Sequence, residues 1–150
     1  MNTQITLRGC FFLLAILVTV LLVGCGHSAN TSAMEVQFKE EFGLQEVQQH
    51  YDFREEYNSY SGVPYEGIAV YSFSVEKNTE PAFDAWEHLP YQTKAADFLE
   101  RISIYVTLPS IQDGVWKLIP RGKTEDELAN ASFCVIDTVN EIGYYIIVDT

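Results

Sequence analysis

The residues that could do chemistry in this chain are few and far apart. Its three histidines are His27, His50 and His88, and no two of them stand at a spacing that would bring them to one metal ion. Cys134 has no cationic neighbour in sequence to lower the pKa of its thiol, which favours a small buried residue over a nucleophile. No Gly-x-Ser-x-Gly motif occurs. We therefore predict no catalytic residue, no metal site and no cofactor.

The 21 Asp and Glu residues leave one catalytic alternative open, a pair of carboxylates for glycoside hydrolysis. Such a pair must be held roughly 5–9 Å apart, a separation that sequence does not fix. Glu55 and Glu56 are adjacent on a predicted strand and should face opposite ways. Asp97 and Glu100 are expected on a solvated helix face. A hydrolase therefore remains the alternative function.

The charge balance excludes two classes of partner. Nine Lys and Arg residues stand against 21 Asp and Glu, giving a formal net charge of −12. Nucleic acid is not an expected partner, because binding it requires cations that neutralise phosphates. Polybasic docking on anionic lipid is excluded for the same reason. The length of 150 residues suits one domain, and the 47% apolar fraction is normal for a globular chain.

The N-terminal segment has the layout of a secretory signal. Arg8 is the only charged side chain before an uncharged, mostly apolar run over 10–23. This run is shorter than the roughly 20 apolar residues that a stable membrane span needs. We therefore expect residues 1–24 to be a signal peptide rather than part of the fold.

The signal ends in Leu22-Val23-Gly24-Cys25, which resembles the lipobox of bacterial lipoproteins. The resemblance implies cleavage before Cys25 and a diacylglyceryl thioether on its sulfur, with palmitate-type acyl chains. Two or three such chains anchor a protein stably where one does not. It further implies a lipidated cysteine and tether at 25–32 and a domain at 33–150. This domain is expected outside the cytoplasm, on the cell membrane or the outer membrane.

A tyrosine-rich loop is the most unusual segment after the signal. Tyr57, Tyr60, Tyr65 and Glu66 lie between two predicted strands. A tyrosine presents an apolar ring with a polar tip, which suits recognition surfaces. These four residues are the predicted partner-binding loop, and a well-packed hairpin connection is the alternative.

The elements that position this loop follow from hydrophobic periodicity. Apolar residues at helical spacing predict helices over 33–42 and 91–101, with Gly43 in the left-handed position after the first. The predicted strands are 44–57, 68–75, 115–119, 132–137 and 142–149. Residues 102–108 stay open between helix and strand. The order predicts an α+β fold: a single domain with an antiparallel sheet of about five strands and two or three short helices packed on one face.

Several short pieces of the domain resemble small secreted or lipid-anchored bacterial proteins of unknown activity. These pieces are the loop 58–67 ahead of a strand, Trp86-Glu-His-Leu-Pro90, Asp113-Gly-Val-Trp116, Val135-Ile-Asp-Thr138, Tyr144-Tyr145 and Asp149-Thr150. The chain has Asn58, Tyr60 and Val63 where that loop carries Asp, His and an aromatic residue. The resemblance implies an architecture rather than an activity.

These observations together favour a binding protein over an enzyme. We expect a lipid-anchored, acidic, non-enzymatic module of the cell envelope, of the inhibitor or immunity type, with an envelope or secreted protein as its partner. The alternative is an envelope hydrolase that uses a carboxylate pair. A passive structural spacer is a third interpretation.

Overall fold

The computed structural model describes residues 33–60, 67–77, 82–122 and 128–149. The chain divides into two compact units, Met1–Met34 and Glu35–Thr150, and the fold below is that of the second unit. The predicted signal peptide, Cys25 and the tether lie outside the described residues.

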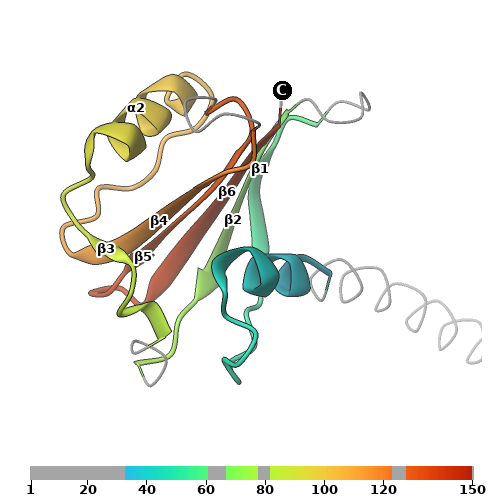
Figure 1. Ribbon diagram of the computed structural model, residues 1–150, viewed down its shortest axis with the longest axis vertical. Helices are drawn as coiled ribbons and strands as arrows, with labels where there is room; N and C mark the ends of the chain where they lie inside the picture. The colour runs from blue at the N-terminus through green and yellow to red at the C-terminus, as the bar shows by residue number, and fades with distance from the viewer. Residues whose placement is uncertain (1–32, 61–66, 78–81, 123–127, 150) are drawn as a thin grey trace, which may run out of the picture. The chain divides into compact units, whose positions relative to one another are not determined.

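Six antiparallel strands form one sheet in the order β1-β2-β6-β5-β4-β3 (Figure 1). The strands are β1 Arg54–Asn58, β2 Gly67–Ser74, β3 Glu87–His88, β4 Gly114–Pro120, β5 Ala131–Asp137 and β6 Ile142–Asp149. The α+β class and the antiparallel sheet are confirmed. The strand beyond the expected five is β3, which pairs only Glu87 with Trp116 and His88 with Val115.

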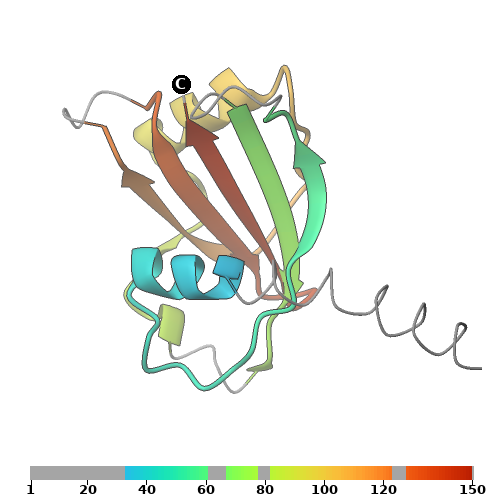
Figure 2. The same ribbon diagram turned by 90° about the vertical axis from the view of Figure 1, so that its right-hand side faces the viewer.

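The two helices lie on opposite faces of the sheet. Helix 33–42 lies in front of the sheet in Figure 2, whereas α2 (Thr93–Ile102) lies behind it. The expectation that the helices pack on one face is therefore wrong. The reason lies in β5, which is buried at every position, so both of its faces need a covering layer.

The face under α2 is aliphatic with a few aromatic rings. Helix α2 directs Ala95, Phe98 and Ile102 towards the sheet, at spacings of three and four residues. Alternate residues of three central strands meet them, which are Ile68, Val70, Phe133, Val135, Ile146 and Val148. The predicted helix over 91–101 is thus confirmed within two residues at its start and one at its end.

The opposite face carries a cluster of aromatic rings. Phe38 of helix 33–42 lies at its centre, with ring centroids 5.1–5.4 Å from those of Phe42, Tyr51, Phe53, Phe73 and Tyr145. Trp86 extends the cluster through its contacts with Phe42 and Phe83. The helix ends where predicted, because Gly43 has a φ of 74°.

The segment 44–53 is not a strand, contrary to the prediction of one strand over 44–57. Only Arg54–Asn58 pairs with β2. The apolar residues of 44–53 alternate because Tyr51 and Phe53 insert into the aromatic cluster. In place of backbone hydrogen bonds between strands, the side chain of Gln49 links this segment to the end of β2. Its Nε2 donates to the Ser74 carbonyl, and its Oε1 accepts from the Glu76 N–H.

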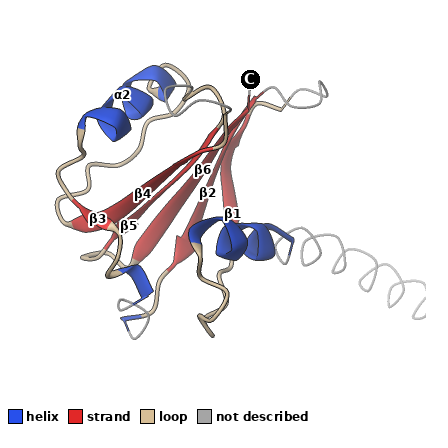
Figure 3. Cartoon of the chain, viewed as in Figure 1, coloured by secondary structure: helices blue, strands red, loops and turns tan. Residues whose placement is uncertain are grey.

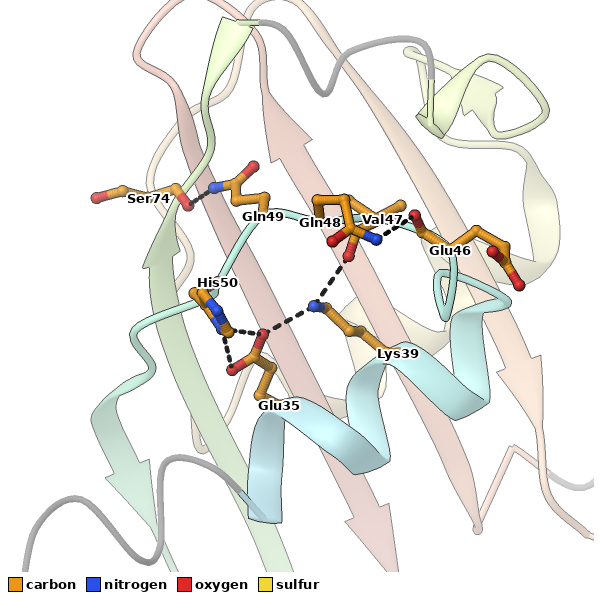
Figure 4. A network of polar contacts seen from close by, with 8 residues as sticks. All are labelled: Glu35, Lys39, Glu46, Val47, Gln48, Gln49, His50 and Ser74. Carbon is orange, nitrogen blue, oxygen red and sulfur yellow. Dashed lines mark hydrogen bonds and ion pairs between the residues drawn. The ribbon is translucent and has the colours of Figure 1, made fainter.

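A polar network ties segment 44–53 to helix 33–42 (Figure 4). Lys39 Nζ lies 2.9 Å from Glu35 Oε1 and donates to the Val47 carbonyl at 3.1 Å. His50 Nδ1 lies 3.3 Å from the same carboxylate oxygen. Burial raises the pKa of Glu35, but hydrogen bonds from Lys39 and His50 and the charge of Lys39 outweigh burial and leave this pKa below its ordinary value of 4.5.

Two further connections lie wholly within the described residues. After Ile102 the chain continues through residues 103–112 as turn and loop, so the open question over 102–108 is settled as neither helix nor strand (Figure 3). The hairpin between β5 and β6 has the predicted loop at 138–141. Asp137 holds it, because its Oδ1 accepts from the N–H groups of Val139 and Asn140.

Trp86→Ala should destabilise the domain by about 3–5 kcal/mol, because a buried aromatic side chain is deleted and a cavity is left. Trp86 is only 5% exposed and contacts two buried rings. Urea denaturation measures the change. Val139→Ala is the control, since Val139 is 68% exposed and should shift stability by less than about 0.5 kcal/mol. Equal effects of the two variants would contradict the packing of Trp86.

Glu35→Gln should flatten the acid dependence of stability. A carboxyl whose folded pKa is lowered stabilises the fold above its unfolded pKa of 4.5 and loses that contribution as pH falls through the folded pKa. The stability difference between wild type and Glu35→Gln should therefore shrink from pH 5 downwards in urea titrations. Glu40→Gln is the control, an exposed carboxylate of the same helix. A difference that stays constant down to about pH 2 would refute the pairing of Glu35.

Candidate functional site

A groove lined by three tyrosines opens on the α2 side of the sheet. It has a volume of about 720 Å³ and lies between strands β1, β2 and β6 and loop residues 105–109. Tyr57, Tyr105 and Tyr144 line it, and we call it the tyrosine groove. The volume falls within the range of about 300–1,000 Å³ that is typical of ligand sites.

Strand register explains why these side chains meet. Tyr57 of β1 pairs with Val70 of β2, and Tyr144 of β6 pairs with Ser72 of β2. Residues 70 and 72 of one strand point to the same face, so both tyrosines lie on the face of Val70, which belongs to the core under α2. Tyr105 approaches from the loop that follows α2.

The end of α2 determines that the groove is open. The helix stops at Ile102, and the following loop leaves Ile104 76% exposed and Tyr105 56% exposed. Only part of the loop returns to the sheet, through the partly buried Val106 and Leu108. The groove is therefore bordered by the largely exposed Tyr105 ring, next to the exposed Ile104 in the same loop.

The polar groups of the tyrosine groove are one cation, one anion and hydroxyls. Arg54 Nε lies 3.7 Å from Glu56 Oε1, and Ser72 Oγ donates to the same oxygen. Burial, followed by the nearby charges of Asp137 and Glu56, raises the pKa of Tyr144. Its hydroxyl therefore stays protonated near neutral pH and can donate a hydrogen bond.

A second pocket adjoins the tyrosine groove along β2. It has a volume of about 450 Å³, and Tyr105 lines both hollows. Its walls are mostly apolar, with Ile68, Phe98, Ile102, Leu128 and Val148, and they include the side chain of Arg101. We call it the Arg101 pocket.

Asp149 lies at the wall of the Arg101 pocket with both carboxylate oxygens engaged. Arg121 Nη2 is 2.8 Å from Asp149 Oδ1, and the Tyr60 hydroxyl donates to Oδ2 at 2.7 Å. Burial and this carboxylate raise the pKa of Tyr60 well above its ordinary range. The Tyr60 ring also packs against Gly67, where an added Cβ would lie 2.9 Å from it. Tyr60 therefore ties the end of β6 to the start of β2.

The predicted partner-binding loop is placed in part. Tyr57 lines the tyrosine groove and Tyr60 contacts Asp149, while Tyr65 and Glu66 lie outside the described residues. The structure adds Tyr105 and Tyr144, which the sequence analysis did not select. The adjacent pair Tyr144-Tyr145 could have identified Tyr144 from sequence. Adjacent residues of a strand face opposite sides of the sheet, so only one of the two tyrosines can lie in the aromatic cluster.

The other candidate chemical groups are not assembled into a site. Cys134 is fully buried in β5, and burial raises the pKa of its thiol, which disfavours the reactive thiolate. His50 and His88 are exposed. Within residues 33–60, 67–77, 82–122 and 128–149, no three His, Cys, Asp or Glu side chains form a group that could hold a metal ion.

The hydrolase alternative gains no support from the described pockets. The tyrosine groove has one carboxylate, Glu56, and the Arg101 pocket has one, Asp149. A third hollow, beside loop residues 106–111, is lined by no acidic side chain. A general acid also needs a raised pKa, yet among the described residues the carboxyl pKa values that shift, those of Glu35 and Asp137, are both lowered.

Comparison with known proteins adds no relative. No protein-family model matches the chain, and neither the curated proteins nor the solved structures contain a match. Among the described residues, no helix has the length and apolar character needed to cross a membrane.

Proposed function

We propose that this protein is a lipid-anchored binding module of the cell envelope, which holds a protein partner in the tyrosine groove. The observation that carries the binding role is the groove itself, where Tyr57, Tyr105 and Tyr144 converge beside an uncovered loop. Tyrosine combines a large contact area with a hydrogen-bonding tip and is enriched in protein interfaces.

The anchor rests on the sequence of the first 25 residues. A basic Arg8, an uncharged run and Leu22-Val23-Gly24-Cys25 follow in the order of a lipoprotein signal. On this proposal Cys25 carries the acyl chains, and the domain works outside the cytoplasm on the cell membrane or the outer membrane.

The net negative charge of the chain indicates what kind of surface its partner has. The chain carries a formal net charge of −12, so a partner with a basic surface is attracted over a distance and an acidic one is repelled. The exposed Ile104 and Tyr105 require apolar side chains on the partner's contact surface. A basic envelope or secreted protein, inhibited or neutralised by the contact, meets both requirements.

Cys25→Ser should abolish lipidation. Wild type is expected to incorporate labelled palmitate and to show an acylated N-terminal Cys25 by mass spectrometry. Cys10→Ser is the matched control, because Cys10 is a cysteine of the same signal segment that lies ahead of the lipobox. It should keep the label. Label on Cys25→Ser, or a wild-type protein without acyl mass, would refute the anchor.

Tyr105→Ser should weaken partner binding about tenfold or more, since truncating a central aromatic contact commonly costs at least about 2 kcal/mol. The measurement is quantitative co-purification after cross-linking on intact cells. Val139→Ser is the control, an exposed apolar residue in the β5–β6 hairpin turn, which does not line the groove. A spacer, in contrast, would yield no specific partner. Equal recovery with both variants would show that the groove is not the binding surface.

A further inference from the structure

Arg101 is an exposed cation beside apolar walls, and it forms no ion pair with another described residue. It belongs to the last turn of α2 and lines the Arg101 pocket. Ion pairs among the described residues include those of Lys39, Arg54 and Arg121, and Arg101 takes part in none of them.

The walls of the Arg101 pocket suit a hydrocarbon body. Phe98 and Ile102 come from α2, and Ile68 and Val148 form a cross-strand pair of β2 and β6 beneath them. Apolar walls around a small number of polar groups are the common composition of small-molecule sites. The cation of this pocket is the Arg101 guanidinium, whose planar fork matches a carboxylate.

The Asp149 carboxylate does not oppose an anionic ligand as a free charge would. Its two oxygens already take the Arg121 guanidinium and the Tyr60 hydroxyl. The charge of Arg121 therefore compensates that of Asp149, and the Arg101 charge remains for the ligand.

We infer that the Arg101 pocket binds a single-chain apolar carboxylate, with the hydrocarbon chain between α2 and the sheet and the carboxylate on Arg101. This ligand site lies beside the tyrosine groove, in which we place the partner contacts. The two hollows share Tyr105, so a bound ligand also alters the surface offered to a partner.

The probe is octanoate, a water-soluble acid with one alkyl chain, and its uncharged match is octanamide. Saturation-transfer NMR on the full-length protein in zwitterionic lipid nanodiscs measures binding, with empty nanodiscs as the blank. Wild type should bind octanoate about tenfold more tightly than octanamide, because a charge-assisted bidentate contact adds to the apolar one.

Two variants separate the Arg101 pocket from its neighbour. Arg101→Gln should bind octanoate about tenfold more weakly and octanamide unchanged, while Arg54→Gln, which removes the cation of the tyrosine groove, should bind both as wild type does. Circular dichroism checks the fold of each variant. Two outcomes would overturn the inference: equal binding of octanoate and octanamide to wild type, or equal binding of octanoate to wild type and Arg101→Gln. The second would leave Arg101 with only its favourable position at the C-terminal end of a helix.

Discussion

The whole structure depends on the burial of β5 and β6 from both sides. Every residue of β5 is buried, and β6 is buried over most of its length. Side chains of these strands point into a different core on each face of the sheet: Phe133 packs under α2, whereas Tyr145 packs against Phe38. The described part of the chain holds only one cysteine, Cys134, which is free. Hydrophobic packing of two layers on one sheet therefore supplies the stability that disulfides supply in many secreted domains.

Sequence patterns predicted the elements whose signals are local. The helix over 33–42 and the strand over 142–149 have the predicted bounds. The helix is defined by its apolar spacing and by the glycine that follows it, and the strand by its apolar run and by the short turn before it. The segment 44–53 was predicted wrongly for a physical reason. Alternation reports that one side of an extended chain is buried, and it does not report whether the backbone pairs with a strand. Here Gln49 supplies side-chain hydrogen bonds to β2 in place of a ladder.

The sequence indicates that the last strand lies inside the sheet, but the helices were still expected on one face only. β6 is apolar at consecutive positions, Ile146 to Val148, as is typical of strands buried on both faces. The tyrosine groove was harder to foresee, because it depends on where α2 ends and on which rows of β2 remain uncovered. Tyr57 was selected from composition, whereas Tyr105 required the three-dimensional path of the loop after Ile102. No pattern in sequence brings residues 57, 105 and 144 together.

The proposed anchor and the acidic charge act together on where the domain works. Residues 25–32, fully extended, reach at most about 29 Å, at 3.3–3.6 Å per residue. A bilayer with anionic lipids repels a chain of net charge −12 over roughly a Debye length of 8–10 Å. On the proposed attachment at Cys25, this repulsion opposes contact of the domain with the lipid surface. On the same proposal, the net charge that disfavours nucleic acid and anionic lipid attracts a partner with a basic surface.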